Sequence, residues 1–379
     1  MAKVIQPSSR KVVLGTGSPG NGRDDYLTRV TSLANQSGKA TQILSLFDYI
    51  QRIGKAKGVD ITRENVLDFY LHNPDRMNQF RDMAFEEVAT RIKNSTDTCL
   101  VSTPSVFEWG GASMFGFDKE HIKLLQPDFI VVIVDDFVRV KKRLQGDPEW
   151  RDKEFSLEMI AKWRRSGIDR VWQIAHEFSP PIPSYIIALE HDPQVLFDLL
   201  FTNKKKVYLS FPITRKALGL LSKVFDFAER LSKYYVVFNP LTIYDWNIVR
   251  KWKKVVDEAN KGGNPIPTRF TCVIPYRDGK RKYTCDSAEV ERIVVDARHQ
   301  IVSRDYKMIG SADYVIVYHP TEDISAGVMC EMVHGRREVK KVYAYYPFEP
   351  SPWFEYYADK IERNERRFFK ILKSLSGIQ

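Results

Sequence analysis

The chain has 379 residues, which is enough for two domains of ordinary size. Hydrophobic residues make up 43% and charged residues 28%, a globular rather than a disordered composition. The formal net charge of +10 at pH 7 is compatible with nucleic acid and with phosphorylated small molecules as partners, and equally with an ordinary solvated surface.

Membrane and metal signals are missing from the sequence. No apolar run approaches the length of a membrane span, and the opening MAKVIQPSSRK lacks the apolar core of a signal peptide. Cys99, Cys272, Cys285 and Cys330 form no C-x-x-C pair and have no histidine cluster beside them, so we expect reduced thiols and no metal site. Cys272 and Cys285 flank a possible hairpin, however, and could approach one another. The expectation is a cytoplasmic protein without a membrane contact.

The first half alternates short apolar runs with segments of helical periodicity, a pattern that predicts a parallel sheet covered by helices. The helical segments include Asp75–Ile92 and Phe155–Phe178. The expected strands are Val12–Leu14, Ala40–Leu44, Thr98–Val101, Phe129–Val134 and Tyr185–Leu189.

The pattern breaks near Asn203. "EHDPQVLFDLLFTNKKK" contains a turn signal, a short amphipathic piece and a basic run, and a new apolar strand begins at Val207. We therefore expect a first domain over residues 1–203 and a second over residues 204–379.

The second half alternates again, so the predicted fold class is α/β, with two domains that each contain a mainly parallel sheet flanked by helices. An insertion over about residues 262–286 contains Asp278-Gly279 between strand-like arms, which predicts a β-hairpin. The expected strands are Val207–Phe211, Tyr235–Phe238, Tyr314–Tyr318 and Lys341–Tyr345, and the expected helices are Lys216–Lys233, Trp246–Asn260, Ser287–Met308, the segment containing Glu331, and Trp353–Leu375.

"VVLGTGSPGNGRDDY" lies between the first strand and the first helix, where a phosphate loop is expected. Gly17 and Gly22 fit the spacing G-x-x-x-x-G-K-[ST], and Gly20 lies between them. However, Arg23 stands at the lysine position and Asp24 at the hydroxyl position that normally ligates magnesium. A carboxylate there adds negative charge beside the phosphate.

This loop, the strand "LLQPDFIVVIVDD" and the arginine-rich segment after it resemble adenylate-kinase-like nucleoside monophosphate kinases over residues 10–190. The resemblance implies a P-loop kinase fold with a degenerate phosphate loop, and Ser102 stands where the family tends to place an acid. The resemblance therefore implies that this domain either binds a nucleotide weakly or has a structural role. Any kinase activity would require magnesium and ATP. The lid arginines would be Arg139, Arg143, Arg151, Arg164 and Arg165, although a basic helix face is equally expected from composition. The implied nucleotide-binding residues are Gly17, Gly20, Gly22, Arg23, Arg139 and Arg143.

Three segments of the second half, "VYLSFPITR", "RDYKMIGSADYVIVYHP" and "SAGVMCEM", resemble the nucleoside 2-deoxyribosyltransferase superfamily over residues 205–346. That superfamily includes a branch that hydrolyses deoxynucleoside 5′-monophosphates. The resemblance implies that Glu331 is the nucleophile that forms a glycosyl ester, that Asp305 is the acid/base, and that no cofactor is required.

Plainer interpretations remain for these residues. Glu331 alone could complement the helix dipole, worth about 0.3–1 kcal/mol. Asp305 could be a solvated helix charge or a partner of Arg304. Asp313 is expected to be a turn residue, and the remaining nearby candidates, His319 and His334, to be satisfied loop or helix histidines.

Ser325 bears on the substrate, because S-x-G-x-x-x-E resembles the monophosphate-specific branch, in which the serine donates to a phosphate, often across a dimer interface. The partners implied are a nucleoside or nucleotide and a second copy of the chain. N-capping is the alternative role of Ser210 and Thr214. The implied substrate-binding residues are Tyr208, Ser210, Phe211, Thr214, Arg215, Ser325, Gly327 and Met332.

Three functions therefore stay open. The second domain cleaves or transfers at an N-glycosidic bond, the first domain phosphorylates a nucleotide, or both halves only bind a nucleotide or nucleic acid. Hydrolysis and transfer are not distinguished by the sequence, since they differ only in whether water or a second base reaches the intermediate.

Overall fold

The computed structural model of the chain describes residues 10–213, 221–276 and 279–378. Contacts divide the chain into two compact units: the first contains Met1–Pro193 and Ile243–Gln300, and the second contains Gln194–Thr242 and Ile301–Gln379. Each unit has a parallel five-stranded sheet flanked by helices, so the predicted α/β class is confirmed. Within the described ranges, no helix is long and apolar enough to cross a membrane.

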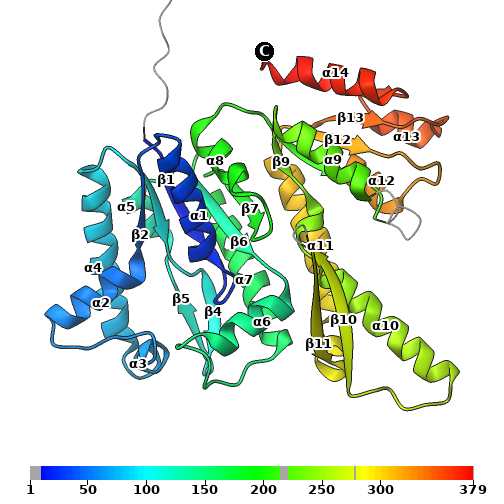
Figure 1. Cartoon of the computed structure of the whole chain (residues 1–379). Helices are drawn as coiled ribbons and strands as arrows, with labels where there is room; N and C mark the ends of the chain where they lie inside the picture. The colour runs from blue at the N-terminus through cyan, green and yellow to red at the C-terminus, as the bar shows by residue number, and fades with distance from the viewer. Residues whose placement is uncertain (1–9, 214–220, 277–278, 379) are drawn as a thin grey trace, which may run out of the picture. The chain divides into compact units, whose positions relative to one another are not determined.

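The sheet of the first unit has the strand order β2-β3-β1-β6-β7, and all neighbours are parallel (Figure 1). Every residue of its four strands other than β2 is buried, because helices such as α1 and α7 cover the sheet. All five predicted strands are confirmed to within one or two residues at their ends. They are β1 (Val12–Thr16), β2 (Thr41–Ser45), β3 (Thr98–Ser102), β6 (Phe129–Val134) and β7 (Ser184–Ala188).

The helices predicted over Asp75–Ile92 and Phe155–Phe178 are confirmed as α4 and α7. An antiparallel hairpin of β4 (Val106–Trp109) and β5 (Ala112–Phe115) was not predicted; its turn is Gly110-Gly111, and both glycines have positive φ. The helices of this part are α1 (Arg23–Gln36), α2 (Leu46–Ala56), α3 (Val66–His72), α4 (Pro74–Lys93), α5 (Lys119–Leu125), α6 (Phe137–Gly146) and α7 (Leu157–His176).

The segment 243–300 belongs to the first unit, whereas the sequence placed it in the second domain. Buried charge explains this difference. The Asp245 carboxylate accepts a hydrogen bond from the Phe137 amide at 2.9 Å and pairs with Arg164 at 2.7 Å. Because an isolated buried carboxylate is costly, these partners fix the segment to the unit that supplies them.

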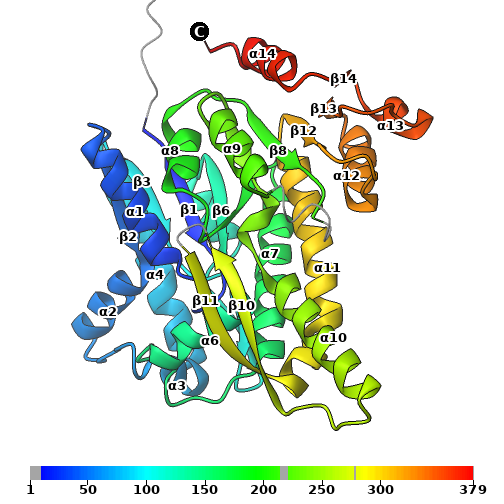
Figure 2. The same cartoon turned by 45° about the vertical axis from the view of Figure 1, so that its right-hand side comes forward.

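The predicted hairpin lies in this segment and is confirmed: β10 (Arg269–Tyr276) and β11 (Gly279–Asp286) are antiparallel, with Tyr276 opposite Gly279. Asp278 of the predicted turn lies outside the described residues. The hairpin contacts α10 (Asp245–Lys261) and is followed by α11 (Ser287–Ser311), as Figure 2 shows.

The sheet of the second unit has the order β14-β13-β12-β8-β9, again entirely parallel. Its core includes Val207 and Leu209 of β8, Ile316 of β12, and two phenylalanines from the helices, Phe227 and Phe368. The strands are β8 (Lys206–Ser210), β9 (Val236–Phe238), β12 (Tyr314–Tyr318), β13 (Lys341–Tyr345) and β14 (Lys360–Glu362), and the helices are α8 (Pro193–Phe201), α9 (Leu221–Ser232), the short 3₁₀ turn Pro240–Thr242, α12 (Ala326–Arg337), α13 (Pro352–Tyr357) and α14 (Glu365–Ser376).

The single helix predicted over Trp353–Leu375 is wrong. The chain forms α13, the edge strand β14 and then α14. Asp359 breaks the helix because its carboxylate accepts the Val342 amide of β13 at 2.8 Å, which draws the following residues onto the sheet edge. Asn364 then caps α14 by accepting the Arg367 amide at 3.0 Å.

Candidate functional site

Glu331 lies on α12, and both of its carboxylate oxygens accept hydrogen bonds from β8. The Tyr208 hydroxyl donates to Oε1 at 2.9 Å, and the Ser210 hydroxyl donates to Oε2. Tyr208 and Ser210 are alternate residues of one strand, so their side chains leave the same face of the sheet. The structure therefore brings together three residues that the sequence singled out, and Glu331 is not a solvated surface charge.

Asp305 lies on α11 and is only 7% exposed. Arg304 donates to its Oδ1 from Nε at 3.0 Å and from Nη2 at 2.8 Å, and Nη2 also donates to the Pro240 carbonyl at 3.1 Å. Burial raises the pKa of Asp305, and the Arg304 charge opposes that rise. The expected Arg304 partnership is present, but the pair is buried beside Glu331 rather than solvated.

Two carboxyl groups share this site, and their charges oppose one another. Burial, and after it the charge of Asp305, raise the pKa of Glu331 to about 8, although the Ser210 and Tyr208 hydroxyls favour its ionised form. Burial also raises the pKa of Tyr208 well above its usual range, which keeps this phenol a hydrogen-bond donor. A half-buried carboxyl with a raised pKa, held by two hydroxyls, is an arrangement suited to nucleophilic or acid/base chemistry.

Ser325 and Gly327 lie at the beginning of α12, and Gly327 has space beside it. Ser325 occupies the N-cap position, yet its side chain makes no capping hydrogen bond. Gly327 is exposed, and a Cβ atom added there would meet only the Ser325 hydroxyl, at 3.7 Å. The packing of the described chain therefore does not require a glycine at position 327, so a ligand could approach there, beside the Ser325 hydroxyl.

The other predicted substrate contacts are placed differently. Phe211 is 3% exposed in the core of the second unit, and Met332 is fully buried, so neither offers surface to a ligand. Phe211 directly follows β8, and its side chain lies on the core-facing side of that strand, whereas Tyr208 and Ser210 lie on the other side. Thr214 and Arg215 lie outside the described residues.

The three remaining polar candidates of this unit have structural partners. Asp313 accepts the Lys206 amide at 2.8 Å, His334 stacks on Tyr306 with ring centroids 3.9 Å apart, and the buried His319 bonds to the loop that follows it.

In the first unit, the phosphate loop is filled by its own chain. Gly17, Gly20 and Gly22 all have positive φ, as a tight loop requires. Asn21, 3% exposed, donates from Nδ2 to the Ile133 carbonyl at 2.5 Å and accepts the Arg23 amide at 3.0 Å. A Cβ atom at Gly17 would collide with this asparagine amide, so the side chain of Asn21 occupies the hollow of the loop.

The charged groups of the loop pair with one another. Arg23 donates to Ser102 at 2.7 Å and pairs with Asp24 at 3.0 Å. Burial alone would raise the pKa of Asp24, but the charge and hydrogen bonds of Arg23 hold it low, so Asp24 stays ionised. A filled loop with a carboxylate at its end does not fit a magnesium triphosphate.

The expected lid arginines are also engaged. Arg139 and Arg143 both pair with the fully buried Asp135, and Arg143 donates to the Gly20 carbonyl at 2.6 Å. Arg164 pairs with Asp245 as described above. Arg151 and Arg165 form ion pairs at the surface with Asp152 and Asp296.

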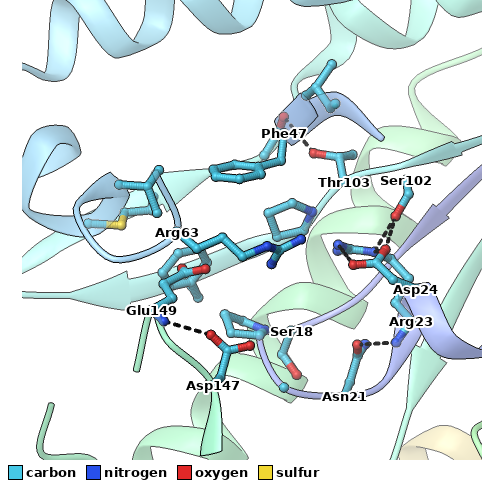
Figure 3. Close-up of a pocket in the computed structure, with 18 of the residues that line it drawn as sticks. Ser18, Asn21, Arg23, Asp24, Phe47, Arg63, Ser102, Thr103, Asp147 and Glu149 are labelled. Atoms are coloured by element: carbon cyan, nitrogen blue, oxygen red, sulfur yellow. Dashed lines mark hydrogen bonds and ion pairs between the residues drawn. The ribbon is translucent and has the colours of Figure 1, made fainter. Parts of the chain in front are cut away.

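Beside this loop lies a cavity of about 280 Å³, bounded also by α2, α3 and the β4–β5 hairpin. Aromatic rings form much of its wall, and Figure 3 shows Arg63 crossing it toward Asp24, with Phe47 on one side and Glu149 on the other. The ring-bearing lining residues are Phe47, Tyr70, Phe107, Phe115 and Trp150.

Two polar side chains of the cavity, Arg63 and Glu149, form no ion pair with a described residue. Arg63 lies over the Phe47 ring at 5.0 Å. Burial, followed by the charge of Asp147, raises the pKa of Glu149 to about 7. The cavity can therefore hold a flat ring between apolar walls and offer it a cation and a proton donor.

Sequence reasoning missed Asn21, Phe47, Arg63 and Glu149. Asn21 had a signal, since an asparagine between Gly20 and Gly22 can fill such a loop. The other three come from α2, the α2–α3 connection and the segment after α6, and only the fold brings them together.

No protein-family model matches the chain, and no curated protein matches it.

Proposed function

We propose that the second unit cleaves or transfers at the N-glycosidic bond of a deoxynucleoside or its 5′-monophosphate, as the resemblance to nucleoside 2-deoxyribosyltransferases implies. One observation carries this proposal. Glu331 receives a hydroxyl on each carboxylate oxygen and lies close enough to Asp305 for the two charges to interact.

In this reaction, ionised Glu331 attacks the anomeric carbon and forms an ester. The bond from that carbon to the base nitrogen breaks and its electron pair goes to the base. The two carboxyl groups share one proton, and Asp305, which holds it while Glu331 is ionised, supplies it to the base. Water or a second base then attacks the same carbon, gives its proton to the Asp305 carboxylate, and the bond from that carbon to Glu331 breaks to release the Glu331 carboxylate. Tyr208 and Ser210 fix the direction of the nucleophile, and their hydrogen bonds favour its ionised form.

The 5′-monophosphate is the favoured substrate class. The Ser325 hydroxyl makes no capping bond at the beginning of α12, where the helix dipole attracts an anion. Gly327 leaves room beside that hydroxyl.

Glu331→Gln tests the proposal, because it keeps the shape and loses the nucleophile. Chromatography measures the free base released from deoxynucleosides and their monophosphates. We expect the rate of this release to fall by more than about a thousandfold. Glu338→Gln, at the exposed C-cap of the same helix, is the matched control and should remain active. Undiminished turnover by a folded Glu331→Gln protein contradicts the proposal.

As a second candidate function, we propose that the first unit binds a nucleoside monophosphate in the Arg63 cavity without transferring a phosphoryl group. Supporting observations are the aromatic walls, the Arg63 cation, which makes no ion pair with a described residue, and the loop filled by Asn21.

Arg63→Ala should weaken the binding of a nucleoside monophosphate to this cavity about tenfold in calorimetry, since a hydrogen bond to a charged group is lost. The measurement uses the Glu331→Gln background, so that no ligand is consumed. Arg52→Ala removes a surface arginine that lies over Tyr49 and pairs with Glu87, and it should leave the affinity unchanged. Phosphoryl transfer from ATP with magnesium would replace this candidate by a kinase.

A further inference from the structure

His319 directly follows β12 and is completely buried. Its amide donates to the Tyr345 carbonyl at 3.0 Å, which continues the pairing of β12 with β13. Its ring packs edge-on against Tyr346, with centroids 5.5 Å apart, and against Phe354 at 6.2 Å. Packing against these two rings therefore restricts the orientation of the imidazole, in addition to its polar contacts.

Both ring nitrogens of His319 bond to the loop that connects β12 to α12. Nδ1 lies 2.9 Å from the Thr321 carbonyl, and Nε2 lies 3.2 Å from the Ser325 amide nitrogen. A carbonyl only accepts and an amide N–H only donates, so Nδ1 carries the proton and Nε2 accepts. A neutral imidazole in this one tautomer thus links the two ends of the loop.

A second buried ring holds the middle of the same loop. The Tyr346 hydroxyl donates to the Glu322 carbonyl at 2.8 Å. His319 accepts the Ser325 amide, and this hydrogen bond fixes the backbone of Ser325. The Ser325 side chain, at the N-cap position of α12, makes no capping hydrogen bond and lies beside Gly327.

We propose that His319 is a positioning residue that sets the preference of the site for a 5′-monophosphate over a nucleoside, by holding the backbone of Ser325. This inference rests on the proposed glycosidic function of the same site. His319 does not touch the substrate; it acts through the Ser325 hydroxyl, which donates to the phosphate. The sugar and base depend on Glu331 and Asp305 instead.

The test compares kcat/KM for a deoxynucleoside 5′-monophosphate with kcat/KM for the same deoxynucleoside. His319→Phe keeps the ring against Tyr346 and Phe354 but loses both hydrogen bonds to the loop. We expect the ratio of the two values to fall on the order of tenfold, through the KM of the monophosphate. His319→Gln, whose amide oxygen can accept the Ser325 N–H, should recover part of the ratio. His334→Phe, which keeps a ring on Tyr306, is the control and should leave it unchanged.

Ser325→Ala should lower the ratio as much as His319→Phe, and the double variant should lower it no further, because both changes remove one contact. A purely structural role of His319 would reduce turnover of both substrates alike and leave the ratio unchanged. That result overturns the inference.

Two measurements separate this inference from the proposed function. In the Glu331→Gln background, calorimetry should show that His319→Phe weakens the binding of the monophosphate and leaves the binding of the nucleoside unchanged. This result is expected whether or not the wild-type chain releases base. Nitrogen-15 shifts of the imidazole should show the Nδ1–H tautomer. The role of His319 would be refuted by an equal loss of affinity for both ligands, by absence of monophosphate binding, or by the opposite tautomer. Absence of base release by the wild-type chain would refute only the glycosidic proposal.

Discussion

Glu331 and Asp305 show how burial changes what two ordinary carboxyl groups can do. The pKa of Glu331 is raised in the folded chain, so ionising this group costs free energy there but not in the unfolded chain. Its contribution to stability is therefore fully present below about pH 4.5, the ordinary value, and is lost as pH rises through about 8. The state required of a nucleophile is thus the state that the fold disfavours.

Asp305→Asn should lower the pKa of Glu331, because it removes the negative charge that opposes ionisation. Titration of the carbon-13 signal of the Glu331 carboxyl should show a midpoint near 8 in the wild-type chain and a clearly lower one in the variant. Asp313→Asn, a matched change at a residue that holds the beginning of β8, should not move the midpoint. Equal midpoints in wild type and Asp305→Asn would mean that the two carboxyl groups do not interact.

At the scale of elements, the predictions that succeeded are those in which local pattern and burial agree. The run FIVVIV of β6 is apolar throughout because the strand is buried on both faces, and its bounds were predicted to the residue. The Asp278-Gly279 signal likewise predicted the hairpin of β10 and β11.

The failures are elements in which a tertiary contact overrides periodicity. Residues 353–375 have helical periodicity, yet the helix is interrupted at Asp359. The carboxylate of Asp359 accepts a hydrogen bond from the Val342 amide and forms ion pairs with Lys341 and Arg336. No sequence window contains those partners, because they lie on α12 and β13. The capping signal of Asn364 was present in the sequence and could have shown where α14 begins.

At the scale of the whole molecule, the chain passes between its two units more than once. Residues 243–300 return to the first unit, and α11 begins in that unit and ends in the second, where it carries Asp305. Buried pairs such as Asp245 with Arg164 decide this arrangement. A linear boundary near Asn203 could not describe it.

Asp245→Asn should destabilise the first unit by about 3 kcal/mol, because Arg164 is left as a buried charge without its carboxylate. Tryptophan fluorescence during denaturation reports this unit, since it contains six of the seven tryptophans: Trp109, Trp150, Trp163, Trp172, Trp246 and Trp252.

Asp296→Asn is the matched control for this change. Asp296 also lies in the returning segment and pairs with Arg165 of α7, but that pair is partly exposed and should contribute less than about 1 kcal/mol. Equal effects of the two variants would show that the Asp245 pair does not hold residues 243–300 to the first unit.

The sequence by itself determined the α/β class and the two parallel sheets, and it indicated Glu331, Asp305, Tyr208 and Ser210 as candidate site residues. Hydrophobic periodicity and local motifs depend only on residues that are near one another in the chain. Only the tertiary structure decided that Tyr208 and Ser210 hold Glu331, that Phe211 and Met332 are core residues, and that Asn21 fills the phosphate loop. These outcomes depend on which face a side chain leaves and on what lies across from it. Burial and hydrogen-bond partners are properties of the packed chain, and residues far apart in sequence supply them.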